Sequence, residues 1–186
     1  MQNEVEIISA VLGGDVDRFG ELVTVHLDAI YRFHLRQTGN RSTAEDLTQE
    51  TFIVAHRSLS KLEDSSRFRP WLYGIARHRA LNHISRVASR QPLLLDPADF
   101  HRHAEPQPKR TKLESEELAE AIDAAIGRLS EDLRTPLLMV AMDQLSYEDV
   151  AVALEVPLGT VKSRIARARC RLIADLKGKG NVFGPP

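Results

Sequence analysis

Apolar side chains recur at helical spacing along most of the chain. Between residues 19 and 33 they return every three or four positions, as expected for one face of an amphipathic helix. This stripe consists of Phe19, Leu22, Val23, His26, Ile30 and Phe33. Gly39 and Asn40 then predict the end of the helix. Leu and Ala are abundant while Gly and Pro are sparse, so the pattern predicts an all-α protein.

Capping and proline signals predict where the next two helices begin. Ser42 and Glu45 have the S-x-x-E form of a capping box, and the helix that they open would run to about Leu59. The polar residues 61–66 then predict a loop. Pro70 suits the first turn of the following helix, where the N–H that proline lacks would have no partner anyway.

The second half is expected to begin near Leu113 with one more apolar stripe, which consists of Leu118, Ile122, Ala125, Ile126 and Leu129. Three helices are expected after it, at residues 136–142, 147–154 and 161–176. Pro136 is expected to open the first of them. Ser146 is expected to cap the second, with Asp149 as its acidic partner three residues later. Residues 155–159 would form a short turn, after which Thr160 begins the last helix.

Prolines interrupt the helical pattern between the two halves, at Pro92, Pro97, Pro106 and Pro108. Such a segment cannot continue a helix, so we expect a flexible linker over residues 89–112. The linker would join two small helical domains, residues 1–88 and 113–178. Residues 179–186 would be a tail with nothing to pack against.

Composition excludes several classes of protein. The 186 residues are 42% hydrophobic, and no apolar run reaches the roughly 18 residues of a membrane span. The first ten residues lack a basic leader before an apolar block, so we expect a cytoplasmic protein. The single cysteine, Cys170, is expected to be half-buried and structural, with redox sensing on a basic helix as the alternative. His101 and His103 are expected to be solvated in the linker, and we expect neither metal nor cofactor.

The net charge is −1, but the charges are distributed unevenly. Residues 65–95 contain six arginines and no acid, and residues 162–179 contain seven cations against the single acid Asp175. Phosphate attraction acts over about 8–10 Å in physiological salt, so local charge matters more than the total. The two basic segments favour nucleic-acid binding, and solvated helix faces are the alternative.

Residues 146–171 have the pattern of a helix-turn-helix, with a short helix, a tight turn and a longer cationic helix. Val150 and Leu154 are expected to face the second helix, at Val161 and Ile165. Ala151 is small enough to let the two helices approach closely. The outer face of the second helix would present side chains that suit bases and phosphates: Lys162, Ser163, Ala166, Arg167 and then Cys170 or Arg171. An ordinary helical hairpin with a basic solvent face is the alternative.

Aromatic side chains alternate with arginines in the first basic segment: Arg69, Trp71, Tyr73, Arg77 and Arg79. An aromatic ring can stack on an unpaired base while arginine binds the backbone, so this pattern is typical of single-strand binding. The alternative is that Trp71 belongs to the core and the arginines only make the outer face soluble.

An acidic cluster precedes that segment: Glu45, Asp46, Gln49 and Glu50. DNA would repel these side chains. We interpret the cluster as a docking surface for a basic partner, with a solvated helix face as the alternative.

Together these segments resemble the bacterial RNA polymerase sigma factors, specifically the minimal group called extracytoplasmic-function sigma factors. The resemblance covers four stretches in family order: FGELVTVHLDAIYRF (19–33), AEDLTQETFIVAHRSL (44–59), RFRPWLYGIARHRALNHI (67–84) and LSYEDVAVALEVPLGTVKSRIARARCRL (145–172). It leaves the linker and tail unmatched. It implies a protein without catalytic activity that binds core polymerase, recognises the −10 and −35 promoter elements, and promotes promoter melting and transcription initiation.

The resemblance also implies a role for each surface. The clamp helices of the largest polymerase subunit would be bound by Asp46, Gln49 and Glu50. The −10 element would be bound by Leu62, Arg69, Trp71, Arg77, His78 and Asn82, with Leu62 where the family holds a flipped-out base. The −35 element would be bound by Lys162, Ser163, Arg164, Ala166, Arg167 and Arg171. An anti-sigma factor is the expected regulator.

Two residues depart from the family pattern. Glu155 stands in the turn where the family often has glycine, so it must adopt a left-handed backbone at a cost of about 1–2 kcal/mol, or the turn must differ. His78 replaces a common asparagine, which leaves the −10 specificity open.

Two other classes of function are the alternatives. A DNA-binding activator or repressor would share the helix-turn-helix, but it has no need for DLTQETF followed by a helix of arginines and aromatics. An enzyme is disfavoured, because the sequence has no Gly-rich phosphate loop, no H-E-x-x-H and no G-x-S-x-G.

Overall fold

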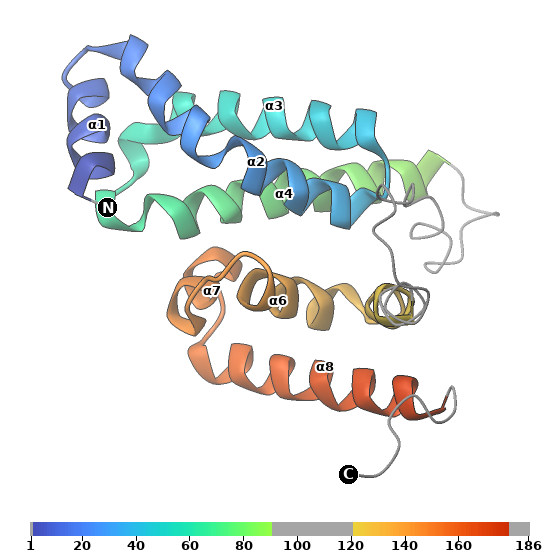
Figure 1. Cartoon of the computed structure of the whole chain (residues 1–186). Coiled ribbons are helices and arrows are strands. Elements are labelled where there is room, and N and C mark those ends of the chain that lie inside the picture. The colour runs from blue at the N-terminus through green and yellow to red at the C-terminus, as the bar shows by residue number, and fades with distance from the viewer. Residues whose placement is uncertain (1, 91–120, 179–186) are drawn as a thin grey trace, which may run out of the picture. The chain divides into compact units, whose positions relative to one another are not determined.

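The computed structural model describes residues 2–90 and 121–178, and every regular element within these ranges is helical (Figure 1). The prediction of an all-α fold is confirmed. The chain divides into two compact units, which carry the helices before residue 91 and after residue 120. No helix in these described ranges has the length and apolarity needed to cross a membrane. Most of the expected linker, both of its histidines and the tail lie outside the described residues.

The first unit is a bundle of three long helices with a shorter helix across one end (Figure 1). The long helices are α2 (Phe19–Thr38), α3 (Arg41–Ser58) and α4 (Phe68–Arg90), and the short one is α1 (Gln2–Leu12). One 3-10 turn, η1 (Val16–Arg18), lies between α1 and α2, and two, η2 (Leu59–Lys61) and η3 (Ser65–Arg67), lie between α3 and α4. The core is built from fully buried side chains of all four helices, including Ile8, Leu22, Ile30, Phe33, Leu72 and Tyr73. The predicted stripe on α2 is buried except for Val23, which is half-buried.

α2 ends at Gly39, as predicted, whereas α3 begins before its predicted cap. Gly39 ends α2 in a left-handed conformation, with φ 64°, and donates its N–H to the Leu35 carbonyl at 2.8 Å. This turn leaves Asn40 extended, and its side chain accepts a hydrogen bond from the Thr43 N–H at 2.9 Å. The predicted cap at Ser42 is therefore wrong, because Asn40 already occupies the cap position. Pro70 lies in the first turn of α4, as predicted.

The second unit begins with a helical segment at residues 121–127, followed by α6 (Glu131–Ala141), α7 (Tyr147–Leu154) and α8 (Leu158–Gly178). Pro136 lies inside α6 and does not open it, so that prediction is wrong. The helix begins earlier because the Ser130 carbonyl accepts the N–H groups of Leu133 and Arg134. Pro136 is buried, so its packing offsets the helical hydrogen bond that it cannot donate.

The helix-turn-helix is present in the second unit. Ser146 caps α7 through a reciprocal pair of hydrogen bonds with Asp149, at 3.0 and 3.4 Å, as predicted. Glu155 follows α7 with φ 54°, which is the left-handed conformation that its position in the turn required. The turn is shorter than expected, because α8 begins at Leu158, and the Pro157 carbonyl accepts the Thr160 N–H at 2.8 Å.

The packing of α7 and α8 follows the predicted pattern. Val150 and Leu154 on α7 are buried, as are Val161 and Ile165 on α8. Ala151 is half-buried, and the expectation that its small side chain lets the two helices approach closely stays a prediction. The opposite side of α8 is exposed at positions between Gly159 and Ala174.

Candidate functional site

The acidic cluster of α3 lies on the surface. Asp46, Gln49 and Glu50 are all exposed, whereas Leu47 and Phe52 on the same helix are buried. Gln49 and Glu50 follow Asp46 by three and four residues, so the three side chains share one face of the helix. The structure therefore brings these three predicted residues together, free to meet a partner.

Ile53 extends the same face and was missed in the sequence. Its side chain is 50% exposed and lies three residues beyond Glu50, one helical turn away. An exposed isoleucine beside carboxylates provides the apolar contact that protein interfaces need at their centre. The signal in the sequence was an apolar residue at the outward position of an otherwise polar helix face.

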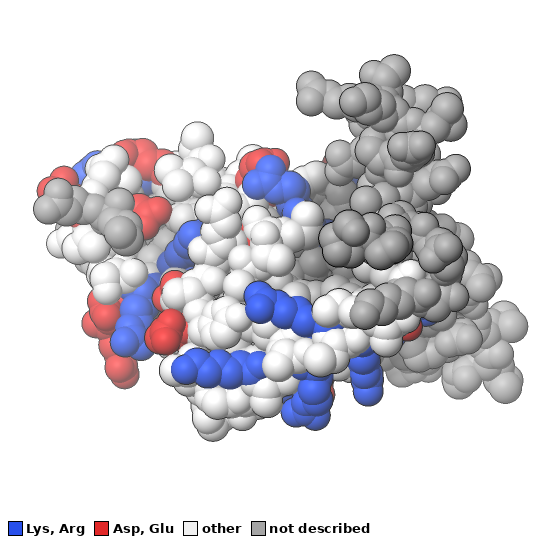
Figure 2. Space-filling view, turned by 60° about the horizontal axis from the view of Figure 1, so that its bottom comes forward, with Lys and Arg blue, Asp and Glu red and all other residues white. Residues whose placement is uncertain are grey.

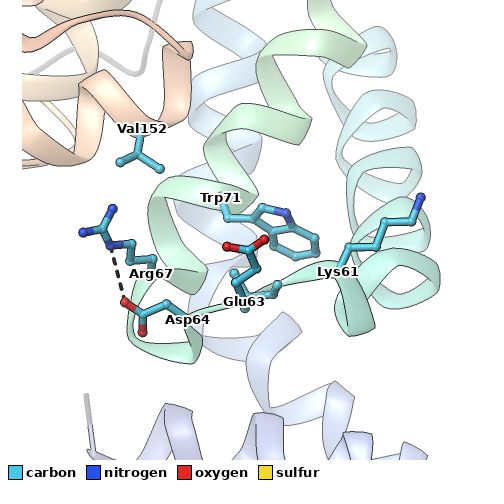
Figure 3. A pocket seen from close by; sticks show the side chains of 7 residues that line it. Lys61, Glu63, Asp64, Arg67, Trp71 and Val152 are labelled. Atoms are coloured by element: carbon cyan, nitrogen blue, oxygen red, sulfur yellow. Dashed lines mark ion pairs between the residues drawn. The ribbon is translucent and has the colours of Figure 1, made fainter.

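The loop between α3 and α4 forms a pocket with the first turns of α4 (Figure 3). Within the first unit, its walls are Lys61, Leu62, Glu63, Asp64, Arg67 and Trp71. Figure 3 shows the indole of Trp71 facing the loop, next to the side chain of Glu63. Leu62 and Trp71, both predicted site residues, thus lie at one pocket.

Asp64 fixes the shape of this loop. Its Oδ1 atom accepts hydrogen bonds from the N–H and the hydroxyl of Ser66, at 2.9 and 2.6 Å, and its Oδ2 atom lies 3.4 Å from Arg67 Nε. The hydrogen bonds from Ser66 lower the pKa of the Asp64 carboxyl group, with a further contribution from the charge of Arg67. The Asp64 carboxylate is therefore occupied by contacts within the loop. Among the charged groups at the pocket, Glu63 and Lys61 have no recorded partner among the described residues.

Trp71, His78 and Asn82 share one face of α4. His78 and Asn82 follow Trp71 by seven and eleven residues, which correspond to about two and three turns of helix. The three side chains therefore project within about 20° of one direction. Trp71 is half-buried, whereas His78 and Asn82 are exposed. The structure therefore places a line of polar side chains leading away from the aromatic wall of the pocket. Arg86, which is exposed and about 60° from this line, is a cation that the site prediction left out.

Three other residues of the aromatic–arginine pattern do not join this face. Tyr73 is 1% exposed and packs edge-on against Phe33, with ring centroids 5.5 Å apart, so its interpretation as a stacking residue is wrong. Arg69 and Arg77 are half-buried, and they project about 160° and 120° away from Trp71. The interleaving visible in the sequence thus mixes residues of the core, the flank and the open face.

The outer face of α8 carries the predicted polar and cationic side chains. Lys162, Ser163, Ala166, Arg167 and Arg171 are all exposed, opposite the buried Val161 and Ile165. Figure 2 turns the side on which α8 lies in Figure 1 toward the viewer, and Lys and Arg side chains stand out from it. Cys170 is also exposed on this face, so its expected half-buried position is wrong.

Two arginines of α8 have different environments. Arg167 Nη2 lies 3.4 Å from Ser163 Oγ, which holds the guanidinium on the outer face. Arg164 is turned toward α6, where its Nη2 atom lies 3.5 Å from Asp132 Oδ1 and its side chain is only 21% exposed. The structure therefore separates Arg164 from the other predicted residues of this helix.

Both units match models of one protein family. Residues 22–90 match Sigma-70 region 2, and residues 119–172 match Sigma-70, region 4. The first match covers the acidic face of α3, the pocket and α4. This is the segment that distinguishes a sigma factor from a repressor carrying the same helix-turn-helix.

Individual relatives agree with the two models. The RNA polymerase sigma-H factor of Pseudomonas aeruginosa is 35% identical, over 90% of this chain and 91% of the relative. The ECF RNA polymerase sigma factor SigW of Bacillus subtilis is 31% identical, over 91% of this chain and 95% of its own length. Among solved structures, the sigma factor RpoE of Bartonella quintana, in complex with the anti-sigma factor NepR, is similar with a TM-score of 0.68 and 26% identity, over 86% and 96% of the two chains. From its two matched regions and these relatives, the chain belongs to the extracytoplasmic-function group of the sigma-70 family of RNA polymerase sigma factors.

Proposed function

We propose that this chain directs RNA polymerase to promoters and that three surfaces divide the work. The observation that carries the proposal is the separation of three kinds of surface. These are an exposed acidic face on α3, a tryptophan-walled pocket beside α4 and a cationic outer face on α8. Each surface suits a different partner, respectively a basic protein surface, unpaired DNA and duplex DNA.

Asp46, Gln49 and Glu50 would bind the clamp helices of the largest subunit of core polymerase. Their exposure on one helix face leaves all three side chains available at once. Charge complementarity would set the register of the complex, and Ile53 would add apolar contact. The exposed carboxylates have no function on a DNA-facing surface, which supports their assignment to a protein partner.

The pocket beside α4 would hold a base flipped out of the −10 element. Leu62 and Trp71 offer an apolar wall and a ring for the base, while His78 and Asn82 lie on the face that would meet the following nucleotides. Arg69 and Arg77, which project elsewhere, would act through the backbone phosphates or through packing. Flipping a base costs a few kcal/mol, which polymerase and DNA binding must offset. The domain would open DNA by trapping the single strand, without covalent chemistry, so we propose that the chain is not an enzyme.

The outer face of α8 would enter the major groove of the −35 element. Arg167 and Ser163 can contact base edges, while Lys162 and Arg171 suit phosphates. Ala166 lies between them and permits close approach of the helix. Arg164, held by Asp132, would orient α8 and not contact a base directly.

Regulation and location follow from the same assignment. The Bartonella RpoE structure contains an anti-sigma factor, and we extend this kind of control to the present chain. An anti-sigma protein would inactivate the chain by covering its DNA-binding surfaces. The chain would act in the cytoplasm, where bacterial polymerase and the chromosome are found.

Run-off transcription tests this proposal. The full chain is added to core RNA polymerase together with a broad library of promoter fragments, and the transcripts are sequenced. We expect transcripts that start downstream of a shared pair of sequence elements and that require the chain. If the chain binds core polymerase and no promoter-specific transcript appears from the library, the proposal is wrong.

A further inference from the structure

The N-terminal helix α1 packs against the two turns on either side of the loop that forms the pocket. It lies across the end of the bundle where α4 begins (Figure 1) and contacts both η2 and η3, the two turns that flank the loop. Ile7, Ile8 and Val11 anchor it with buried side chains. Because α1 ends before residue 22, it lies outside the segment that matches Sigma-70 region 2.

One polar contact ties α1 to the rest of the unit. Glu4 Oε1 on α1 lies 2.9 Å from His26 Nε2 on α2, and the side chains are 25% and 7% exposed. A carboxylate accepts hydrogen bonds, so His26 Nε2 donates. Burial lowers the pKa of His26, the carboxylate of Glu4 opposes that shift, and the positive charge of Arg69 on α4 adds to it.

The contact continues through aromatic rings to the pocket. The ring of His26 packs against Phe68, with centroids 5.4 Å apart, and Phe68 packs against Trp71, with centroids 5.9 Å apart. Phe68 is completely buried, so it cannot move without displacing its neighbours. A continuous line of contacts therefore runs from Glu4 to the aromatic wall of the pocket.

We infer that α1 positions the −10 pocket, and that Glu4 acts as a positioning residue through His26 and Phe68 on Trp71. The inference rests on the proposed function of the pocket in holding an unpaired base. A site that binds a flat ligand needs its walls fixed by surrounding contacts, since small displacements weaken stacking. Glu4 does not reach the pocket itself, so its effect must pass through the rings.

The experiment uses the full chain with four substitutions. Glu4→Ala removes the carboxylate that accepts the hydrogen bond from His26. Glu4→Asp keeps the charge but shortens the side chain by one methylene, which moves the carboxylate away from His26. Glu4→Gln keeps an acceptor oxygen in place, and Glu6→Ala changes an exposed carboxylate on the same helix as the matched control. If Glu4→Ala fails to fold by circular dichroism, Glu4→Asp carries the test.

Trp71 is the only tryptophan of the chain, so intrinsic fluorescence reports on this wall alone. We expect Glu4→Ala and Glu4→Asp to change the emission maximum and the acrylamide quenching of Trp71 in the free protein. In complex with core polymerase, the same variants should bind a single-stranded −10 non-template oligonucleotide about fivefold more weakly, because a displaced Trp71 ring loses part of its stacking on an unpaired base. Their affinity for core polymerase should stay within about twofold of the native chain, and Glu4→Gln and Glu6→Ala should match the native chain in all three measurements.

Two results would overturn the inference. One is a Glu4→Ala protein whose Trp71 fluorescence and oligonucleotide binding equal those of Glu6→Ala. The other is an equal loss of polymerase and oligonucleotide affinity, which would indicate general destabilisation. If the native complex does not bind the oligonucleotide, the proposed function of the pocket fails, while the fluorescence of the free variants still decides whether Glu4 positions Trp71.

Discussion

Arg164 of α8 reaches back to Asp132 of α6, with Nη2 and Oδ1 3.5 Å apart, and this contact removes it from the row of side chains that faces outward. One turn further along the helix, Arg167 stays on the exposed face beside Ser163. Two arginines that look equivalent in the sequence therefore have different environments. We expect the first to orient the helix and the second to contact DNA.

Substitution of these two arginines should have different effects on −35 binding. We expect Arg167→Ala to weaken binding to a −35 duplex about tenfold to a hundredfold, the range for one base contact. Arg164→Ala should weaken binding only a few-fold and destabilise the unit by less than about 1 kcal/mol, since Asp132 is largely exposed. Fluorescence anisotropy with a labelled duplex measures the affinities, and Asp132→Asn should reproduce the Arg164→Ala result. A larger effect from Arg164→Ala than from Arg167→Ala would contradict these assignments.

Reversal of charge on α3 should weaken polymerase binding at one face only. Glu50→Lys places a cation in the proposed docking surface, and we expect its affinity for core polymerase to fall by about tenfold or more. Glu45→Lys is the control. Glu45 belongs to the acidic cluster in the sequence and is also exposed, but it projects about 140° away from Glu50 and so does not join the docking face. Biolayer interferometry with immobilised core polymerase gives both affinities. Equal losses in the two variants would show that only net charge matters.

Acid should destabilise the first unit through His34. This side chain is 0% exposed, its Nε2 atom lies 2.9 Å from Thr51 Oγ1, and burial lowers its pKa to about 4. The Thr51 hydroxyl donates to the Leu47 carbonyl at 2.7 Å, so His34 donates to it from Nε2. The lowered pKa keeps the ring neutral near pH 7. The unfolded chain binds a proton below about pH 6.5 and the folded chain only below about pH 4. The contribution of His34 to the free energy of unfolding is therefore fully present above pH 6.5. This contribution falls by about 3 kcal/mol as the pH drops to 4.

Urea unfolding followed by Trp71 fluorescence measures this dependence at each pH. His34→Gln cannot titrate, so its stability should vary less between pH 6.5 and pH 4 than that of the native chain. A His34→Gln protein with an undiminished slope would show that other groups cause the acid sensitivity.

Glycine at the turn of the helix-turn-helix should stabilise the second unit. Glu155 has φ 54°, a conformation that costs a residue with a Cβ atom about 1–2 kcal/mol. Its neighbour Val156 donates to the Ala151 carbonyl at 3.1 Å, so the left-handed turn is held by a helix-ending hydrogen bond. We expect Glu155→Gly to raise stability by roughly 1 kcal/mol and Glu148→Gly, inside α7, to lower it by a similar amount. Hydrogen exchange of the α7 and α8 amides in the full chain checks both signs.

Local patterns predicted the elements well where one physical rule acted alone. Ser146 and Asp149 were identified as a capping pair because no other cap-forming residue competes at that turn. The left-handed backbone at Glu155 was one of two foreseen outcomes, because the family that the sequence resembles often has glycine at that position. The outward positions of α3 and α8 followed from helical periodicity.

Predictions were wrong where two rules competed or where a distant partner decided. Asn40 and Ser42 are both residue types that cap helices well. The left-handed turn at Gly39 leaves Asn40 extended, so Asn40 is the residue that caps α3. Pro136 suggested a helix start, but burial of the helix outweighed the missing hydrogen bond. The pairing of Arg164 with Asp132 and the burial of Tyr73 against Phe33 depend on tertiary packing, which residue spacing does not reveal.

Permanganate reactivity of −10 thymines in the holoenzyme–promoter complex tests most directly whether the first unit opens DNA. The native chain and Trp71→Phe, which keeps a ring at the pocket, should both make non-template thymines reactive. Trp71→Ala should reduce that reactivity about tenfold while polymerase and −35 binding persist, because one stacked base is lost. Equal reactivity with Trp71→Ala and with the native chain would contradict the account.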